Sequence, residues 1–273
     1  MTTTHLLLTE SLVSGYGAKT IVNNVDLEIP AGKISVIVGA NACGKSTLLK
    51  TIARLIPTQS GSVILDGKRI DQIPTKELAR TLGLLPQQPV APEGIAVADL
   101  VGRGRHPHQK LFRSWTADDD LAVAQALMAT GVHDLADRPV DELSGGQRQR
   151  VWIAMALAQQ TEVLLLDEPT TFLDVSHQIE VLDLLTDLNH ERGTTIVMVL
   201  HDINLAARYA DHIFALRDGQ LIAGGAPSEV ITSDLMRDVF ALDSLVIADP
   251  VSGSPIVLPR GRHHVLTAPG ETA

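Results

Sequence analysis

The sequence is poor in cysteine, in long apolar runs and in positive charge, and each shortage excludes a class of protein. Cys43 is the one cysteine in 273 residues, so neither an intrachain disulfide nor a multi-thiolate metal site is available. That cysteine usage is typical of a reducing compartment. No apolar run approaches the ~20 residues of a membrane span, and the first residues do not resemble a signal peptide. Any membrane association must therefore come through a partner.

Positive charge is also scarce. The net charge is -10 and the isoelectric point is about 5.4, so the chain has no general basic field for nucleic acid. We accordingly expect no nucleic-acid partner. An anion can still bind where backbone amides and a lysine converge.

One stretch provides such a place. Residues 39–47 fit the phosphate-loop pattern G-x-x-x-x-G-K-[ST], between an apolar run at 34–38 and a helical pattern at 45–55. Unpaired amides at the positive end of a helix dipole can bind phosphate. Lys45 can reach the β and γ phosphates of ATP, and the Ser46 hydroxyl can ligate Mg2+. A chance glycine-rich turn would not explain the flanking strand and helix. The predicted nucleotide-binding residues of this loop are Gly39, Ala40, Asn41, Ala42, Cys43, Gly44, Lys45, Ser46 and Thr47.

Polar side chains follow three other apolar runs. Asp167 and Glu168 end one run, His201 follows a second and Gln87 follows a third. Ligands of open α/β sheets bind at the carboxyl ends of the strands. We expect Asp167 to hold Mg2+, and Glu168 to orient or deprotonate the attacking water. Gln87 can ligate Mg2+ or the water, and His201 can bridge the γ-phosphate and Glu168. The alternatives are structural: an acidic turn, a loop cap and a satisfied histidine.

The remaining pattern indicates an α/β protein. Short strands are predicted over 6–38, followed by a hairpin with a two-residue turn at Asp66-Gly67. Residues 95–160 are mostly helical, and a subdomain boundary is expected just before them. Later, a buried strand, the helix 176–192 and a second buried strand follow one another, which predicts parallel pairing.

Two helix predictions are specific enough to check. Three acids at 118–120 place a helix start there, and the apolar spacing gives its core face. A last helix is expected from Ser228. The predicted core face of the helix that begins near Asp118 consists of Leu121, Val123, Ala124, Leu127 and Met128.

Five motifs in register resemble the ATP-binding cassette (ABC) ATPases. They are a Walker A loop at 39–47, a glutamine loop at Gln87, a signature motif at 144–147, a Walker B strand at 163–168 and a switch histidine at His201. The similarity runs from about residue 6 to about 240. It implies a RecA-like P-loop core, an N-terminal antiparallel β subdomain and an inserted helical signature subdomain.

The resemblance also sets domain boundaries and adds one ligand contact. The expectation is a single ABC ATPase domain over 1–273, with its core at 1–88 and 161–245. The helical subdomain is expected at 89–160, and a C-terminal extension with a frayed end at 246–273. Tyr16 alone would be read as a half-buried strand residue, but the family stacks an aromatic on adenine at this place.

Members of this family bind ATP between two copies packed head to tail. The signature segment opens a helix, so its amides form a second anion-binding terminus, far in sequence from Lys45. A second chain can therefore supply it, in a homodimer with two-fold symmetry that forms when ATP is bound. The residues expected to act in trans are Ser144, Gly145, Gly146, Gln147 and Asp174.

Local detail resembles the ATPases of ferric-siderophore importers, notably over 102–108, 170–178 and 199–204. A stand-alone cassette without spans suits an importer with separate membrane subunits. We expect polytopic permease subunits to contact residues 87–108, a separate substrate-binding protein on the far side, and a peripheral location on the cytoplasmic face of the inner membrane. His106 and His108 are interpreted as contacts to the permease, because two histidines without a third ligand make a weak metal site. The alternatives are a cobalamin or haem importer, or a soluble ABC ATPase of an iron–sulfur assembly scaffold.

The phosphate loop departs from many family members at two positions. Ala40 and Ala42 stand where proline and glycine are common, so Ala42 needs a backbone conformation that tolerates a Cβ. Cys43 lies at a helix N-terminus, which can lower the pKa of a thiol. Its simpler role is that of a small residue that fills the loop.

Overall fold

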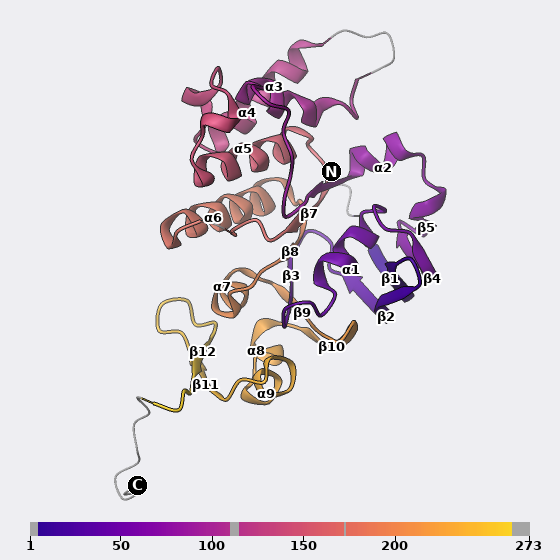
Figure 1. The fold of residues 1–273 in the computed structure, drawn as a ribbon, viewed down its shortest axis with the longest axis vertical. Helices are drawn as coiled ribbons and strands as arrows, with labels where there is room; N and C mark the ends of the chain where they lie inside the picture. Colours follow the sequence, from indigo (N-terminus) through magenta and orange to yellow (C-terminus); the bar gives the residue numbers. More distant parts are fainter. Residues whose placement is uncertain (1–4, 110–114, 172, 264–273) are drawn as a thin grey trace, which may run out of the picture.

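The structure is a computed structural model that describes residues 5–109, 115–171 and 173–263. Helix α1 (Lys45–Ile52) contacts strands of both large sheets. Figure 1 shows the antiparallel strands on one side of this helix, helices α3 to α5 at one end of the molecule and the C-terminal elements at the other. Over the described ranges, no helix has the length and hydropathy needed to cross a membrane.

A six-stranded sheet forms the centre, in the order β10-β9-β3-β8-β7-β6. All neighbours pair in parallel except β9 and β10, which confirms the parallel pairing predicted for the two later apolar runs. Every residue of β3, β7 and β8 is buried, as expected for strands covered on both faces. The carboxyl ends of the parallel strands therefore share one edge, where the polar residues follow. The bounds are β3 (Ile34–Gly39), β6 (Leu82–Leu85), β7 (Val163–Asp167), β8 (Thr195–Val199), β9 (His212–Arg217) and β10 (Gln220–Gly225).

A second, antiparallel sheet packs against α1. Its order is β2-β1-β4-β5, with strands β1 (Leu7–Tyr16), β2 (Lys19–Ile29), β4 (Thr58–Leu65) and β5 (Lys68–Arg69). The turn between β4 and β5 is formed by Asp66 and Gly67, which have φ values of 52° and 74°. Such values at both central residues define the mirror-image turn that suits a two-residue hairpin, as the sequence predicted.

Helices dominate the segment between β6 and β7. They are α3 (Val97–Gly102), α4 (Ala117–Ala129) and α5 (Gly145–Ala158), whereas α2 (Thr75–Thr81) precedes β6 and packs beside it. Arg105 and Asp119 form a buried ion pair at 2.9 Å that joins the end of α3 to the start of α4. Arg105 also donates to the carbonyl oxygen of Ala158, so one side chain links three segments.

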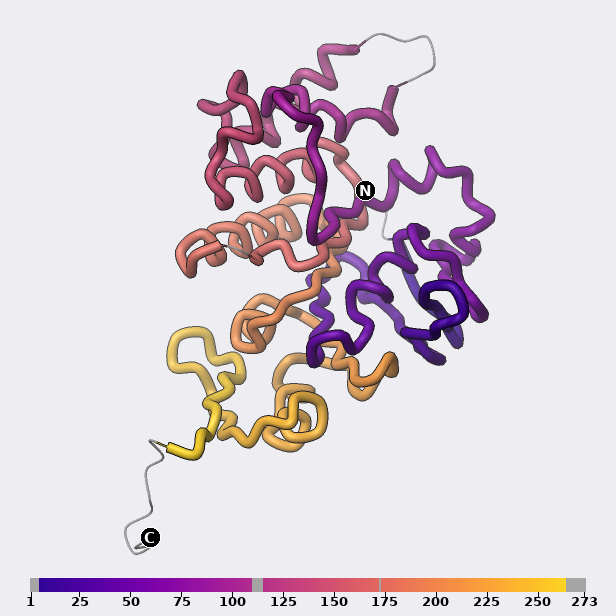
Figure 2. The backbone as a smooth tube through the Cα atoms, in the orientation of Figure 1, coloured from indigo at the N-terminus to yellow at the C-terminus, as the bar shows by residue number. Residues whose placement is uncertain are grey.

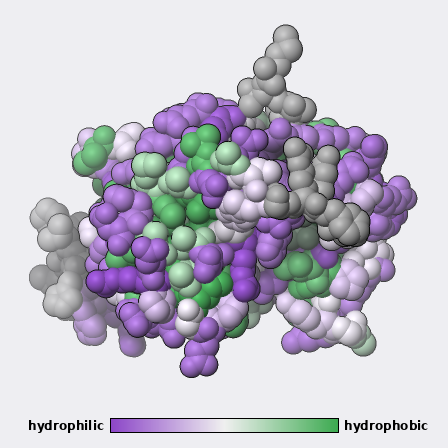
Figure 3. Space-filling model, turned by 90° about the horizontal axis from the view of Figure 1, so that it is seen from above, coloured by the Kyte–Doolittle hydropathy of each residue, from purple (hydrophilic) through white to green (hydrophobic). Residues whose placement is uncertain are grey.

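The predicted core face of α4 is partly wrong. Val123 and Leu127 are buried as predicted, but Leu121 and Met128 are 57% and 62% exposed. Ala122 and Ala126 are buried instead, so the buried face is rotated toward the smaller residues. Seen from this end of the molecule, the surface mixes hydrophilic side chains with scattered hydrophobic ones (Figure 3).

Four helices and a hairpin complete the fold. Gly193, in the left-handed conformation with φ 67°, ends α6 as predicted. The helix expected from Ser228 is two short helices, α8 and α9, because the chain leaves helical geometry at Ile231 and Thr232. Figure 2 follows the chain to the terminal hairpin, at the end opposite α3 and α4. The bounds are α6 (Val175–Arg192), α7 (Ile203–Tyr209), α8 (Pro227–Val230), α9 (Ser233–Phe240), β11 (Ser244–Ala248) and β12 (Pro255–Pro259).

Candidate functional site

The phosphate-loop residues wrap an open cavity at the carboxyl edge of the central sheet. The cavity has a volume of about 530 Å3 and is lined by residues 41–47 together with Ile21, Gln87, Glu168 and His201. The loop joins β3 to α1, as predicted. Gly39 must be a glycine, because a Cβ at its φ of 153° would lie 2.3 Å from the carbonyl oxygen of Leu216. The loop thus brings its amides and Lys45 to face the same space as four residues from distant segments.

Lys45 is buried within this loop. Its Nζ donates to the carbonyl oxygens of Gly39 at 2.9 Å and Ala40 at 3.0 Å. The ammonium group therefore sits over the loop where phosphate oxygens would replace these carbonyls as its partners. Ala42 adopts φ 62°, a left-handed conformation that costs on the order of 1 kcal/mol for a residue with a Cβ.

Asp167 and Ser46 meet below the loop. The Ser46 hydroxyl donates to Asp167 Oδ1 at 2.8 Å, and the Nζ of Lys50 lies 3.8 Å from Oδ2. Oδ2 is buried and accepts no hydrogen bond from a described residue. Burial raises the pKa of Asp167, and the hydrogen bond from Ser46 opposes that shift.

These groups fit Mg2+ by their chemistry. The ion prefers oxygen ligands and is usually held by one or two carboxylates with water and phosphate. A buried carboxylate oxygen without a partner, next to a serine hydroxyl, is such a donor set. Over the described residues no cluster of three or more His, Cys, Asp or Glu side chains could hold a metal.

Glu168 points away from Asp167 and is held by three side chains. Its Oε1 lies 2.6 Å from Nε2 of His201. Its Oε2 accepts from Nε2 of Gln87 at 2.5 Å and from the hydroxyl of Thr171 at 3.0 Å. The two neighbouring carboxylates therefore have different partners.

The backbone at Glu168 is itself unusual. Its φ is 57°, a left-handed conformation that costs on the order of 1–3 kcal/mol for such a residue. The chain turns sharply at the end of β7, and this turn aims the carboxylate into the cavity. A buried carboxylate held in one orientation beside a phosphate loop can accept a proton from a water molecule.

Tyr16 lies outside this cavity. It ends β1, the residue is 56% exposed, and it is not among the residues that line the cavity. The exposed ring remains available to a flat ligand that extends beyond the loop.

The signature segment is likewise remote from the cavity. Ser144 caps α5, its hydroxyl accepting from the amide of Gln147 at 3.3 Å, and no residue of 144–147 lines the cavity. The prediction that this segment opens a helix is confirmed. Asp174 caps α6 and also lies outside the cavity, and Phe172 before it falls outside the described residues.

The sequence analysis missed several contributors. Ile21 lines the cavity, and Thr171 holds Glu168. Lys50 stands one helical turn after Ser46, and that spacing was the available signal for its position near Asp167. Gly219, in the turn between β9 and β10, donates its amide to the carbonyl oxygen of Cys43 at 2.9 Å. No sequence pattern pointed to Gly219.

One expectation about a reactive side chain needs correction, and one predicted contact residue also has a partner within the chain. Burial raises the pKa of the Cys43 thiol, against the lowering expected from the helix N-terminus, although Lys45 opposes the shift. The ring Nε2 of His108 lies 2.7 Å from the carbonyl oxygen of Gln159, so this histidine has a partner within the chain. His106 is exposed and remains free to contact another protein.

Comparison with known proteins identifies a matching family and close relatives of this chain. The model of the ABC transporter family matches residues 22–171. The chain is 54% identical, over 93% of its length and 92% of the relative, to the protein named probable siderophore transport system ATP-binding protein YusV of Bacillus subtilis (strain 168). It is 52% identical, over 95% of its length and 96% of the relative, to the ferric enterobactin transport ATP-binding protein FepC of Escherichia coli (strain K12).

Two solved structures resemble the fold. A metal-chelate type ABC transporter in an inward-facing conformation matches with a TM-score of 0.81 and 28% identity, over 94% of this chain and 98% of that one. The dimeric, post-hydrolysis ATP-binding cassette MJ0796, bound to ADP and phosphate, matches with a TM-score of 0.71 and 29% identity, over 81% of this chain and 98% of that one.

Proposed function

The chain belongs to the ABC transporter family, and we propose that it is the ATP-hydrolysing subunit of an importer that takes up a ferric siderophore. Its reaction is the hydrolysis of ATP to ADP and phosphate. The observation that carries the proposal is the arrangement around Glu168, because His201, Gln87 and Thr171 hold this carboxylate beside the phosphate loop. The relatives' names, which include a siderophore system and ferric enterobactin transport, support the substrate class. They do not favour cobalamin, haem or a scaffold role.

The residues of the site have different roles in hydrolysis. The amides of residues 39–47 and the ammonium group of Lys45 bind the phosphates. Glu168 accepts a proton from the water whose oxygen bonds to the γ-phosphorus, and the bond from that phosphorus to the bridging oxygen breaks. His201 and Gln87 hold the Glu168 carboxylate in place. Ser46, Asp167 and Gln87 would hold Mg2+, which neutralises charge that develops on the phosphates.

The site is completed by a second copy of the chain. The signature segment, Ser144 to Gln147, begins a helix and contributes no residue to the phosphate-loop cavity of its own chain. A head-to-tail dimer brings it, with Asp174, onto the ATP bound by the other copy. The dimeric cassette with ADP and phosphate supports this assembly.

Further partners follow from the importer assignment. We place the chain on the cytoplasmic face of the membrane, with permease subunits in contact with residues 87–108 and a separate substrate-binding protein on the far side. The helical region α3 to α5 is then the inserted subdomain at 89–160, between core segments 1–88 and 161–245. Exposed His106 lies in the permease-facing segment.

Uptake by whole cells tests the proposal directly. Cells that lack the chromosomal copy are supplied with wild type, Glu168→Gln or the control Glu28→Gln, at an exposed position of β2, and uptake of radiolabelled ferric siderophore is measured. Uptake restored by wild type and Glu28→Gln, but not by Glu168→Gln, supports the proposal. Co-purification of the tagged chain with a polytopic membrane protein supports the permease contact. Normal uptake by cells without the chain would rule the function out.

A further inference from the structure

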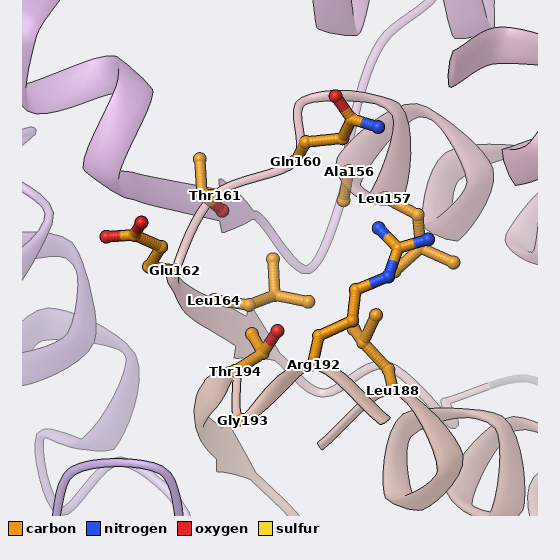
Figure 4. A pocket seen from close by; sticks show the side chains of 10 residues that line it. All are labelled: Ala156, Leu157, Gln160, Thr161, Glu162, Leu164, Leu188, Arg192, Gly193 and Thr194. Carbon is orange, nitrogen blue, oxygen red and sulfur yellow. The ribbon is translucent and has the colours of Figure 1, made fainter. Parts of the chain in front are cut away.

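A second, smaller cavity lies at the opposite edge of the central sheet. It has a volume of about 190 Å3 and sits between the C-terminal ends of α5 and α6 and the starts of β7 and β8 (Figure 4). The nucleotide cavity lies at the carboxyl ends of the same strands, and the two cavities share no lining residue. A ligand in one would not displace a ligand from the other.

Its walls are apolar. Ala156 and Leu157 come from α5, Leu164 from β7 and Leu188 from α6. An engineered cavity of about 150 Å3 with such a lining binds benzene. The walls therefore offer room for an apolar group about the size of one aromatic ring.

Arg192 adds a positive charge at the rim. Figure 4 shows its side chain rising from the end of α6 so that the guanidinium group lies beside Leu157. Within the described ranges, no hydrogen bond or ion pair engages this group. An arginine at a helix C-terminus interacts favourably with the helix dipole, but this guanidinium reaches the cavity rather than the terminal carbonyls. It is placed to form a bidentate pair with a carboxylate.

Neutral polar groups surround the same space. Thr161 and Thr194 line the cavity and carry hydroxyl groups. Gln160 accepts from Nη1 of Arg105 through its amide oxygen at 2.9 Å, which leaves its amide nitrogen to donate elsewhere. These groups can donate to the oxygens of a bound anion.

The acids nearby do not cancel this charge. Glu162 also lines the cavity, but its carboxylate contacts the ring of His5 and points away from Arg192 (Figure 4). Asp187 and Glu191 line a neighbouring hollow that shares Leu157, Gln160, Leu188 and Arg192 with this cavity. They disfavour an anion there, so the smaller cavity is the one that suits a carboxylate.

We propose that this cavity is a binding site for a small carboxylate with an apolar body, such as an aromatic or branched aliphatic acid. The apolar part occupies the space between Leu157, Leu164 and Leu188, and the carboxylate pairs with Arg192. This site is additional to the transport function and independent of it.

Benzoate is the probe that tests the site. Binding to the purified full chain is followed by ligand-observed NMR titration in saturating ADP, with benzamide and acetate as comparison ligands. We expect saturable binding of benzoate that ADP does not compete, and binding of benzamide or acetate that is weaker by about tenfold or more. Absence of saturable benzoate binding, or its displacement by ADP, would overturn the proposal.

Substitutions test which residues bind benzoate. Arg192→Met removes the charge and keeps the length, and we expect it to weaken benzoate binding by about tenfold or more. Arg237→Met, at an exposed arginine of α9, is the matched control and leaves binding unchanged. Leu188→Trp fills the cavity while Arg192 stays, and it abolishes binding in a protein whose melting temperature shows that it is folded. Equal binding by wild type and Arg192→Met, or by wild type and folded Leu188→Trp, contradicts the assignment.

Discussion

Nε2 of His201 lies 2.6 Å from Oε1 of Glu168, although the two residues follow different strands. The other oxygen of the same carboxylate accepts from Gln87, which follows a third strand, and from Thr171. The segments that follow β6, β7 and β8 thus converge on one side chain. Displacement of any of them would alter the orientation of the carboxylate.

Replacement of Glu168 by glutamine should separate binding from turnover. The amide cannot take a proton from water, so we expect hydrolysis to fall by about 10²–10⁴-fold. ATP affinity should persist, and dimers should accumulate with ATP on a sizing column. Glu93→Gln, at an exposed position, is the control. A monomeric Glu168→Gln protein with normal turnover would show that Glu168 is not the base.

Replacement of Lys45 by alanine should abolish nucleotide binding. The ammonium group is buried in the loop, where it would pair with the phosphates. Calorimetry with ATP should give no detectable heat for Lys45→Ala and a normal isotherm for Lys68→Ala, an exposed control. Unchanged affinity of Lys45→Ala would refute the assigned role.

Alkylation of Cys43 should be slow and should block ATPase activity once complete. Burial raises the pKa of this thiol, so little thiolate is present near neutral pH and the rate should rise as the pH rises. Bound ATP should protect Cys43, because the residue lines the nucleotide cavity. The reaction is followed by mass spectrometry against Cys43→Ser, which should stay active and unmodified. Full activity after stoichiometric modification would disprove the prediction.

Loss of the buried arginine at position 105 should destabilise the helical region. Arg105→Met leaves the Asp119 carboxylate buried without its cation, and such a change costs about 3–5 kcal/mol. The free energy of unfolding is measured by urea denaturation, with the exposed Arg103→Met as control. Equal stability of the two variants would mean that Asp119 is solvated without Arg105.

The His5 contacts should make stability depend on pH. Burial lowers the pKa of His5, but its ring contacts with Asp66 and Glu162 outweigh burial and raise the pKa above the ordinary value. Their contribution is therefore complete below the unfolded pKa of about 6.5 and is lost as the pH rises through the folded pKa. The cost of His5→Gln, about 1 kcal/mol or less, should shrink between about pH 6 and about pH 9.

Thermal unfolding at several pH values measures this difference. His106→Gln is the control, since the side chain is exposed and makes no described contact. A cost of His5→Gln that grew with pH would contradict the sign of the shift.

Much of the fold could be predicted because its signals are local. Parallel strands with every residue buried are continuous apolar runs, the Asp66-Gly67 turn selects its hairpin, and Gly193 ends its helix. The face of α4 could not be predicted in this way. Alanines on this helix pack against neighbouring elements. That packing leaves Leu121 and Met128 exposed to solvent, although both side chains are hydrophobic.

In the candidate site, too, residues within motifs could be predicted and residues without a local sequence signal could not. Motifs gave Lys45, Glu168, His201 and Gln87, which the fold brings to one cavity. Thr171 was missed because threonine after a strand is common and carries no pattern of its own. The pKa of Cys43 was misjudged because the helix N-terminus is visible in the sequence, whereas burial is not.

Gly219 connects the phosphate loop to a turn from the far end of the sequence. Its amide bonds to Cys43, its carbonyl accepts from Asn23, and a Cβ on it would lie 2.0 Å from the carbonyl oxygen of Ile21. Its φ of 77° is also unfavourable for any other residue. A genetic screen for lost transport would therefore recover substitutions at position 219 together with those in the loop. Without knowledge of the contacts between Gly219 and the loop, such alleles would be mistaken for mutations in a second functional site.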